Sequence, residues 1–351
     1  MLSNVEDRAK MRNEIRRDYL TGRWVILAPG RSKRPSDFAV KRIHGEPKTC
    51  AFCRGNENLT PPANLLFIPQ PKGVIKTADK GRRRRSDWVV RCIPNLYPAV
   101  SSLGSKAERS DQFPFLRQAA FGFHEIILES PKHDDHPHRA SQTQTEFWLN
   151  AAIDRVNDLS DRKGVESIVL FRNHGREAGA SIAHAHSQII TTPIVPTRLE
   201  EECEALKRIR RMTGSCALCK VRAHEAKSPR RVLSSHGYDV ITPWASVFPF
   251  EFWIIPKRHS PSIVGLSQKE VEELAKVLRL SFKALAGLLS DPPYNLAFHL
   301  APTRTYDDVF HWHIEVYPKL TVWAGFELGS GMYINTMKPE IAAQALRREI
   351  S

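Results

Sequence analysis

The chain has 351 residues and a formal net charge of +14 at pH 7, with 41% hydrophobic and 26% charged residues. These proportions are typical of a globular domain, and no apolar run reaches the roughly 20 residues of a membrane-spanning helix. The N-terminal segment is charged throughout and has no apolar core of a signal peptide. We therefore expect a soluble cytoplasmic protein without a membrane partner. The excess of positive charge favours anionic partners such as nucleic acid, nucleotides or sugar phosphates.

The first half of the chain is predicted to combine short strands with helices. Residues 1–19 read as a charged lead-in that can form a helix. Apolar residues at helical spacing predict a helix at 143–161, and an acidic-then-basic run at 198–212 predicts a helical connector between the halves. β-branched and aromatic runs predict strands at residues 23–27, 88–93, 124–129, 167–171 and 182–191.

The second half repeats this order. A capping box of Ser267 and Glu270 predicts a helix that continues to about Leu289. Strands are predicted at residues 238–242, 251–255, 295–300 and 311–317. Two strands, a helix and two further strands in each half predict an α+β fold, built on antiparallel sheets with flanking helices. We expect an N-terminal domain at 1–197 and a C-terminal domain at 198–351.

A ladder of metal-ligand residues occurs twice in the same order. Each copy has a Cys-x-x-Cys pair, then a histidine after Pro-Lys, then a His-x-His motif. Cys2His2 is a closed tetrahedral ligand set, which is typical of structural zinc, although the second site could hold iron instead. The two predicted sets are Cys50, Cys53, His133 and His184, and Cys216, Cys219, His259 and His311.

Some histidines and cysteines lie outside this pattern. His124 and His136 crowd around His133, which is preferred because its Pro-Lys context matches that of His259. His124 and His299 are predicted to be surface or core residues, and Cys92 and Cys203 to be core thiols. Paired cysteines used for metal binding fit a reducing compartment better than a disulfide framework does.

The first His-x-His motif also carries candidate chemistry. In a strand, His184, His186 and Gln188 share one face, so a metal-bound His184 would hold His186 in place as an exposed neutral nucleophile. Gln188 can donate its amide hydrogen to an oxyanion. In the second half Glu315 takes the place of Gln188, and a carboxylate would repel phosphate, so that half is expected to be structural or metal-binding.

Two further segments are candidates for phosphate binding. Asn173 precedes a small-residue loop that offers backbone N–H groups, and this loop continues through Gly179, Ala180 and Ser181. The basic turn after the first strand contains Arg31, Ser32, Lys33 and Arg34. Together with His186, these groups indicate attack on phosphorus and a phosphohistidine-type intermediate.

Taken together, these motifs resemble the galactose-1-phosphate uridylyltransferase family of the histidine-triad superfamily, which includes ADP-glucose phosphorylase. Asn95-Leu96-Tyr97-Pro98 and the segment from Gly325 to Gly331 also match, so the resemblance covers about residues 20–340. It implies histidine-triad-like halves, a homodimer and ping-pong nucleotidyl transfer from a nucleotide sugar to a sugar 1-phosphate or phosphate.

The resemblance also implies roles for individual residues. His186 would carry the nucleotidyl group, with Gln188 and Ser181 beside the phosphoryl groups. Phe326 and Glu327 would sit at the sugar end of a partner subunit's site. The implied substrate-binding residues are Arg31, Ser32, Lys33, Arg34, Asn95, Asn173, Gly179, Ala180, Gly325, Phe326 and Glu327.

Two departures from the uridylyltransferase pattern keep the substrate open. The signature has proline where this chain has Ala185, and alanine at this position is more similar to the adenylyl branch. Phe326 stands where a tyrosine is usual. A uridylyltransferase acting on UDP-glucose and hexose 1-phosphate is the first hypothesis, and an ADP-glucose phosphorylase is the second. A zinc-stabilised nucleic-acid-binding protein that uses Arg82 to Arg85 is the alternative of another class.

Overall fold

The computed structural model describes residues 12–31, 49–71, 73–102, 109–302 and 309–350, and of residues 109–112 only the backbone. Within these ranges, every helix is too short or too polar to span a bilayer.

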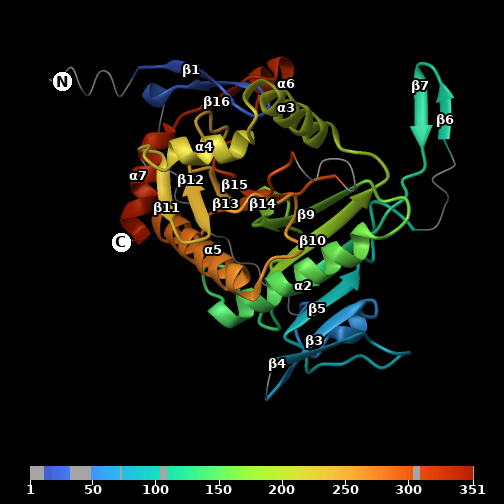
Figure 1. Ribbon diagram of the computed structural model, residues 1–351. Helices are drawn as coiled ribbons and strands as arrows, with labels where there is room; N and C mark the ends of the chain where they lie inside the picture. Colours follow the sequence, from blue (N-terminus) through green and yellow to red (C-terminus); the bar gives the residue numbers. More distant parts are fainter. Residues whose placement is uncertain (1–11, 32–48, 72, 103–108, 303–308, 351) are drawn as a thin grey trace.

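One 11-stranded antiparallel sheet runs through both halves of the chain (Figure 1). The N-terminal half contributes β9 (Ser167–His174), β10 (His186–Thr192), β8 (His124–Leu128), β5 (Val90–Pro94), β3 (Leu65–Gln70) and β4 (Gly73–Thr77), in that spatial order. On the other side of β9 follow β14 (Tyr294–His299), β15 (His313–Pro318), β13 (Phe252–Pro256), β12 (Tyr238–Ile241) and β11 (Arg231–Ser234).

The strand order confirms the duplicated antiparallel architecture that the repeats predicted. Starting from the centre, β9, β10, β8, β5 and β3 are matched by β14, β15, β13, β12 and β11. A long helix follows β8 and β13 in each half: α2 (Gln142–Ser160) and α5 (Gln268–Leu289). The sequence did not predict that β9 and β14 pair, with Tyr294 opposite His174 and Phe298 opposite Leu170. This pairing joins the two sheets into one.

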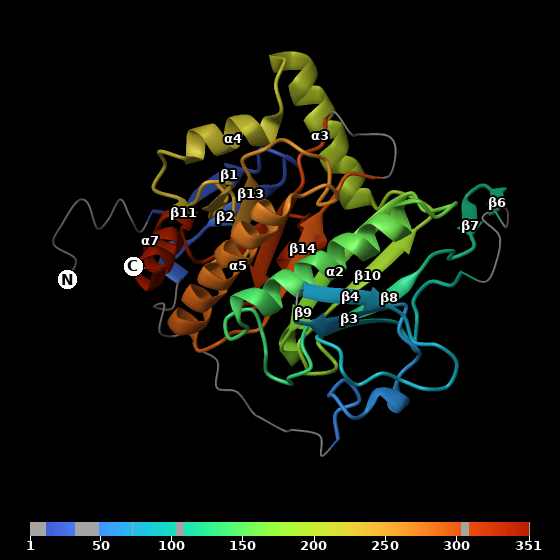
Figure 2. The ribbon, with the colours of Figure 1, turned by 60° about the horizontal axis from the view of Figure 1, so that its bottom comes forward.

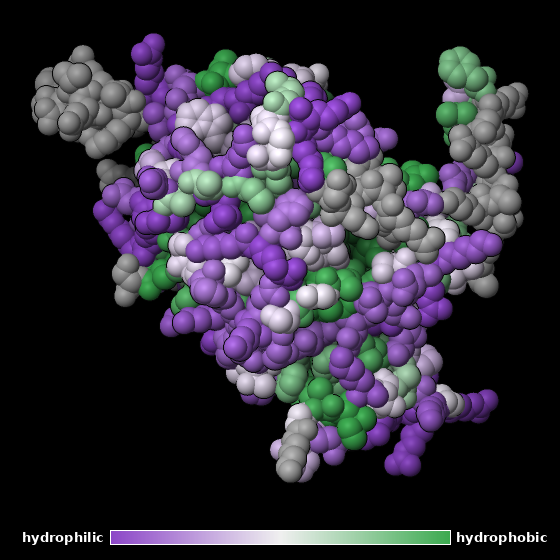
Figure 3. All heavy atoms as spheres, in the orientation of Figure 1, coloured by the Kyte–Doolittle hydropathy of each residue, from purple (hydrophilic) through white to green (hydrophobic). Residues whose placement is uncertain are grey.

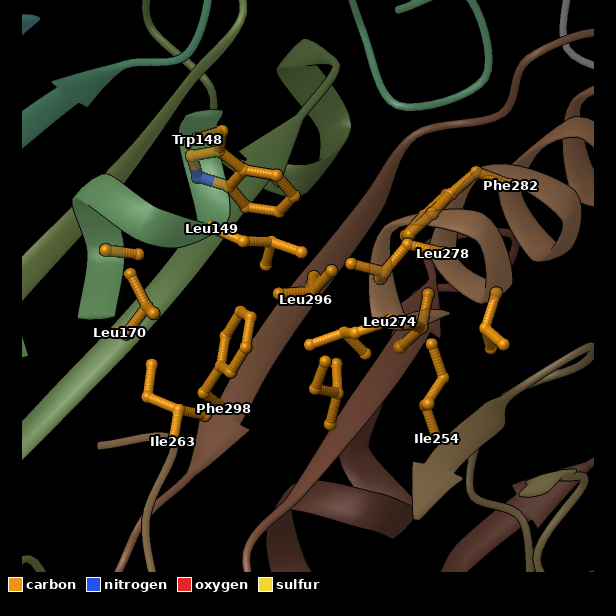
Figure 4. Close-up of a cluster of buried hydrophobic side chains, with 14 of the residues drawn as sticks. Trp148, Leu149, Leu170, Ile254, Ile263, Leu274, Leu278, Phe282, Leu296 and Phe298 are labelled. Atoms are coloured by element: carbon orange, nitrogen blue, oxygen red, sulfur yellow. The ribbon is translucent and has the colours of Figure 1, made fainter. Parts of the chain in front are cut away.

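The helices α2 and α5 lie side by side on the same face of the sheet (Figure 2). Trp148 and Leu149 of α2 meet Leu274, Leu278 and Phe282 of α5 above Leu296 and Phe298 of β14 (Figure 4). Because side chains alternate along a strand, the opposite face of β8–β10 remains available for the histidines. The principal core thus packs against one face, and the histidines of β8 and β10 lie on the other.

The helices predicted at 143–161, at 198–212 and after Ser267 match the observed ones to within one residue at their starts. Helix α2 begins after Ser141, whose side chain accepts a hydrogen bond from the N–H of Gln144. Helix α5 begins with the predicted capping box of Ser267 and Glu270. The connector is α3 (Thr197–Thr213), which is followed by α4 (Ala217–Glu225).

A small second sheet corrects the prediction of a helical lead-in for residues 14–17, while residues 1–11 of that prediction lie outside the described residues. Residues Glu14–Arg17 form β1, which pairs with β2 (Trp24–Leu27), and β16 (Tyr333–Asn335) adds to β2 in parallel. Arg16 is buried between Glu340, at 2.9 Å, and the ring of Trp244, at 3.8 Å. These contacts with distant parts of the chain outweigh the local helical preference of a charged segment.

The remaining elements are short. Among the described residues, 3-10 turns occur at Pro29–Arg31, Glu57–Leu59 and Arg176–Ala178. Helix α6 (Gly325–Ser330) contacts β16, and the C-terminal helix α7 (Pro339–Ile350) packs on α5 and β11. The hairpin of β6 (Arg109–Gln112) and β7 (Phe115–Gln118) projects from the body, with the apolar side chains of Phe113, Phe115 and Leu116 exposed near its tip (Figure 3).

Candidate active site and metal centres

The structure brings the first predicted ligand set together. The ligand atoms of Cys50, Cys53, His133 and His184 all lie within 4.8 Å of one another. The Cys53 Sγ atom is 3.4 Å from His133 Nδ1 and 3.5 Å from His184 Nδ1. A tetrahedral zinc ion with ordinary bond lengths separates its sulfur and nitrogen ligands by about 3.5 Å. The four residues therefore fit zinc.

The second set has the same arrangement in the C-terminal half. The ligand atoms of Cys216, Cys219, His259 and His311 also lie within 4.8 Å of one another. The Cys219 Sγ atom is 3.4 Å from His311 Nδ1 and 3.8 Å from His259 Nδ1. Cys216 is the N-cap residue of α4, so the start of this helix fixes the spacing of the two thiols.

The hydrogen bonds of the outer ring nitrogens of His184 and His311 support metal binding at both sites. The Nε2–H group of His184 donates to the carbonyl oxygen of Ser130 at 2.8 Å, and that of His311 donates to the carbonyl of Pro256 at 2.9 Å. Each ring therefore carries its proton on Nε2 and presents the lone pair of Nδ1 to the thiols. Burial lowers the pKa of His184 to about 4 and, with the nearby His259, that of His311 to about 3.

A third group of ligands was not predicted. Glu202 of α3, His299 of β14 and His313 of β15 place their ligand atoms within 4.8 Å of one another. Two imidazoles and a carboxylate are a donor set that suits iron as well as zinc. His299 was expected at the surface or in the core, but its position directly opposite His313 in the β14–β15 pair brings it into this group. The alternation along each strand indicates the face of the histidine, but only the strand register brings the two histidines together.

His186 is held by the residue that supplies the first metal ligand. Its Nδ1–H group donates to the backbone carbonyl of His184 at 2.7 Å, which leaves the lone pair on Nε2 for chemistry. The expectation that His186 is exposed is wrong: only 5% of it is accessible, because Phe52 packs against the ring at 5.4 Å between centroids. Burial lowers the pKa of His186 to about 4, so the ring is neutral at pH 7.

Gln188 and Asn95 meet at a histidine that the sequence did not assign to the site. The Oε1 atom of Gln188 lies 2.9 Å from Nε2 of His124, and the Asn95 amide nitrogen lies 3.0 Å from the same atom. His124 is at the start of β8, two positions before Ile126, the residue opposite Gln188. Its face of the strand was therefore predictable, but its partner was not.

The small-residue loop is fixed by the C-terminal half. Asn295 of β14 donates to Oδ1 of Asn173 at 2.8 Å and to the carbonyl of Ala178 at 2.7 Å. Gly175 has φ of 81°, and a Cβ atom there would lie 2.7 Å from Cβ of Pro293, so only glycine fits this turn. Beyond the turn, Gly179 and Ser181 are exposed and Ala180 is half-buried.

The second half has the same histidine arrangement, but both ring nitrogens of its second histidine have partners. The Nδ1–H group of His313 donates to the carbonyl of His311 at 3.2 Å, as His186 does to His184. However, Nε2 of His313 faces a carboxylate oxygen of Glu315 at 3.2 Å. Glu315 is itself paired with Arg198 at 2.6 Å. The expected contrast between Gln188 and Glu315 therefore coincides with a difference at Nε2, which is free in His186 and faces a carboxylate in His313.

The remaining predicted residues lie apart from β10. Arg31 is exposed in the first 3-10 turn. Backbone N–H groups, that of Ala324 first, lower the pKa of Glu327, and the charge of Arg31 adds a smaller effect. Gly325 and Phe326 are exposed on α6, which lies beside β16 and well away from β10 (Figure 1). Ser32, Lys33 and Arg34 are outside the described residues. Among Arg82 to Arg85, all but the half-buried Arg84 are exposed.

The chain is similar to proteins of one family over nearly its whole length. The family model for the N-terminal domain of galactose-1-phosphate uridyl transferase matches residues 3–196, and that for the C-terminal domain matches 202–349. An ADP-glucose phosphorylase of Arabidopsis thaliana is 34% identical over 95% of this chain and 92% of its own. A galactose-1-phosphate uridylyltransferase of Thermotoga maritima is 28% identical, over 95% of this chain and 98% of its own.

Solved structures agree with these sequence matches. The crystal structure of an ADP-glucose phosphorylase from Arabidopsis thaliana with bound ADP-glucose has a TM-score of 0.80 and 31% identity, and covers 96% of this chain and 99% of that one. A uridylyltransferase structure has a TM-score of 0.72 and 27% identity, covering 96% and 98% of the two chains. The chain therefore belongs to the galactose-1-phosphate uridylyltransferase family.

Proposed function

We propose that the protein transfers a nucleotidyl group from a nucleoside-diphosphate sugar to an acceptor phosphate through His186. The observation that carries this proposal is that His184 contributes both its ring and its backbone carbonyl to the site. Its ring belongs to the Cys2His2 set, and its backbone carbonyl orients His186 with Nε2 left free. A zinc ion held by this set would fix the carbonyl and hence the nucleophile, so that orientation is established before substrate binds.

The reaction takes place in two displacements. The lone pair of His186 Nε2 attacks the α-phosphorus, the bond from that phosphorus to the bridging oxygen breaks, and sugar 1-phosphate leaves. An oxygen of the acceptor phosphate then attacks the same phosphorus and breaks the N–P bond. The low pKa of His186 favours this role, because the ring carries no proton on Nε2 before the attack.

Amide groups around His186 suit the charge that develops on the phosphoryl oxygens. Gln188 lies two residues along the same face of β10, and Asn173 lies one residue before the end of the neighbouring strand β9, beside the small-residue loop. Both side-chain oxygens are occupied, by His124 and Asn295 respectively, which leaves the NH2 groups to donate. We infer that Ser181, Gly179 and Ala180 line the phosphate site and that Asn95 and the basic turn at Arg31 bind nucleotide or phosphate.

For the nucleotide, we propose ADP-glucose as the substrate to test first, with phosphate as acceptor. The 34% identity to an ADP-glucose phosphorylase exceeds the 28% identity to a galactose-1-phosphate uridylyltransferase at equal coverage of this chain. Ala185 in the His-x-His motif supports the same choice. UDP-glucose with hexose 1-phosphate is the second candidate, which the match to both uridyl transferase domain models favours.

Covalent labelling tests the nucleophile and the nucleotide together. The protein is mixed without acceptor with ADP-glucose or UDP-glucose carrying a labelled α-phosphate, and acid-labile label on the protein is measured. We expect label from one nucleotide sugar on the wild type and on the control His224→Ala, an exposed histidine, and none on His186→Ala. Labelled His186→Ala would disprove the nucleophile, and no label from either sugar would contradict the proposed reaction.

We infer that two copies of the chain complete each site. Phe326 and Glu327 lie on α6, apart from β10 within one chain, although the family resemblance gives them a role at the sugar end. Mixing His186→Ala with Glu327→Ala under conditions of subunit exchange should restore about a quarter of the activity of a wild-type mixture, because one site in a mixed dimer is intact. Two inactive variants that stay inactive after exchange would contradict shared sites.

A further inference from the structure

The side chain of His124 is held between a backbone amide and the amide of Gln188. The N–H group of Ala99 donates to Nδ1 of His124 at 3.1 Å. On the opposite edge of the ring, Nε2 lies 2.9 Å from Oε1 of Gln188. Nδ1 thus faces an N–H donor, and Nε2 faces an amide oxygen, which is an acceptor.

The Ala99 contact decides which nitrogen of His124 carries the proton. A backbone N–H group can only donate, so Nδ1 must accept and has no hydrogen of its own. The proton of the neutral ring then lies on Nε2, and Nε2–H donates to Oε1 of Gln188. The amide nitrogen of Asn95 lies 3.0 Å from Nε2, but Nε2 has no lone pair in this tautomer and cannot accept from it. The Asn95 N–H groups are therefore available to other acceptors.

This contact also decides the orientation of the Gln188 amide. An amide that accepts with its oxygen from His124 turns its NH2 group away from that ring. Gln188 and His186 occupy alternate positions on β10 and therefore share one face of the strand. The free NH2 group is consequently presented on the side of the nucleophile, where an amide oxygen would repel a phosphoryl group.

We propose that His124 is a positioning residue for the transfer reaction: it fixes the flip state of Gln188 so that an N–H donor faces the reacting phosphoryl group. This inference rests on the proposed function of His186 and Gln188. It adds a residue from β8, a strand that otherwise contributes packing to the site. His124 itself touches no reacting atom and takes no proton in either displacement.

Two substitutions separate this role from a purely structural one. His124→Gln puts an N–H donor at about the position of Nε2 and keeps the bond to Gln188, but loses the acceptor for Ala99. His124→Asn does the reverse, because its side-chain oxygen reaches about the position of Nδ1 and nothing reaches Gln188. The readout is the single-turnover rate of protein labelling at saturating nucleotide sugar, with zinc content measured to confirm folding.

We expect His124→Asn to slow labelling by about 10-fold to 100-fold, somewhat less than the loss of an oxyanion donor, and His124→Gln to stay within about 5-fold of wild type. In a Gln188→Ala background, His124→Asn should cause no further loss, since it acts through Gln188. The reverse order, with Gln slower than Asn, or additive losses in the double variant, would overturn the proposal. If His124→Asn fails to fold, a rate for His124→Gln as low as that for Gln188→Ala overturns it instead.

His186→Ala in the same experiment distinguishes failure of this inference from failure of the proposed function. An unlabelled His186→Ala, together with equal rates for both His124 variants, rejects only the positioning role. A labelled His186→Ala rejects the nucleophile and the positioning role with it.

Discussion

At the scale of single residues, the six cysteines divide into two kinds by their surroundings. Cys50, Cys53, Cys216 and Cys219 each lie beside imidazole nitrogens in a closed ligand set. Cys92 and Cys203 are buried in apolar clusters, and burial raises the pKa of both thiols, that of Cys203 to about 12. A thiol of this kind remains protonated and packs as a small hydrophobic side chain.

The two kinds should respond differently to substitution. We expect Cys50→Ser and Cys216→Ser each to remove one equivalent of zinc per chain and to lower the melting temperature, because structural zinc contributes folding free energy. Cys92→Ala should keep its zinc. Metal analysis of the purified proteins and a thermal melt check this prediction. Unchanged zinc in Cys50→Ser would reject the first site without affecting the second.

At the scale of elements, β10 is held in place from both of its faces. On the helix face, the indole N–H group of Trp148 in α2 donates to the hydroxyl of Ser187 at 2.9 Å. On the other face, His186 and Gln188 are held by the His184 carbonyl and His124. Helix α2 thus fixes Ser187, β8 fixes Gln188 and the residue before the strand fixes His186, and the small-residue loop depends in the same way on β14 through Asn295.

Replacing Asn295 tests that dependence on the second half. Asn295→Asp removes both donated hydrogen bonds and places a carboxylate beside the phosphate loop, so we expect about a 10-fold or larger drop in the labelling rate. The control is Asn150→Asp on α2, where the side chain donates only to the carbonyl of Glu146. Zinc content should be normal in both variants. Equal rates for the two would show that β14 does not support the loop.

At the scale of the whole molecule, the β9–β14 pair joins the two halves into one sheet with a shared core. Five consecutive residue pairs, from Tyr294–His174 to Phe298–Leu170, join the sheets, and α2 contacts α5 above the junction. A single hydrophobic cluster includes residues of both halves, among them Trp148 and Phe282. Neither half can lose its structure without exposing apolar surface of the other.

We therefore expect one unfolding transition rather than two. Calorimetry should give one peak whose van't Hoff and calorimetric enthalpies agree, and fluorescence and far-ultraviolet circular dichroism should report the same midpoint. Two separate transitions, or a fluorescence midpoint that differs from the circular dichroism midpoint, would mean that the halves unfold independently.

The sequence predicts those parts of the molecule that depend on local spacing. The ligand sets follow from the cysteine and histidine motifs that occur in the same order in both halves, and the capping box of α5 follows from Ser267 and Glu270. His124, Asn295 and the Glu202–His299–His313 group could not be assigned, because each acts through a partner that only strand register or helix packing brings near. The same is true of the β9–β14 pairing, which depends on contacts far apart in the chain.

The junction between β9 and β14 also protects the chain from other chains. Either strand without the other would present a row of unpaired backbone groups, which is a template for aggregation. Of the two outer edges that remain, β11 is covered by α7, while β4 carries Lys76, whose ammonium pairs with Asp154 at 2.7 Å. Each repeat therefore acts as the edge cover of the other. The N-terminal repeat therefore requires the C-terminal one even though Glu315 occupies the Nε2 atom of His313, because without β14 the edge of β9 would be open to pairing with other chains.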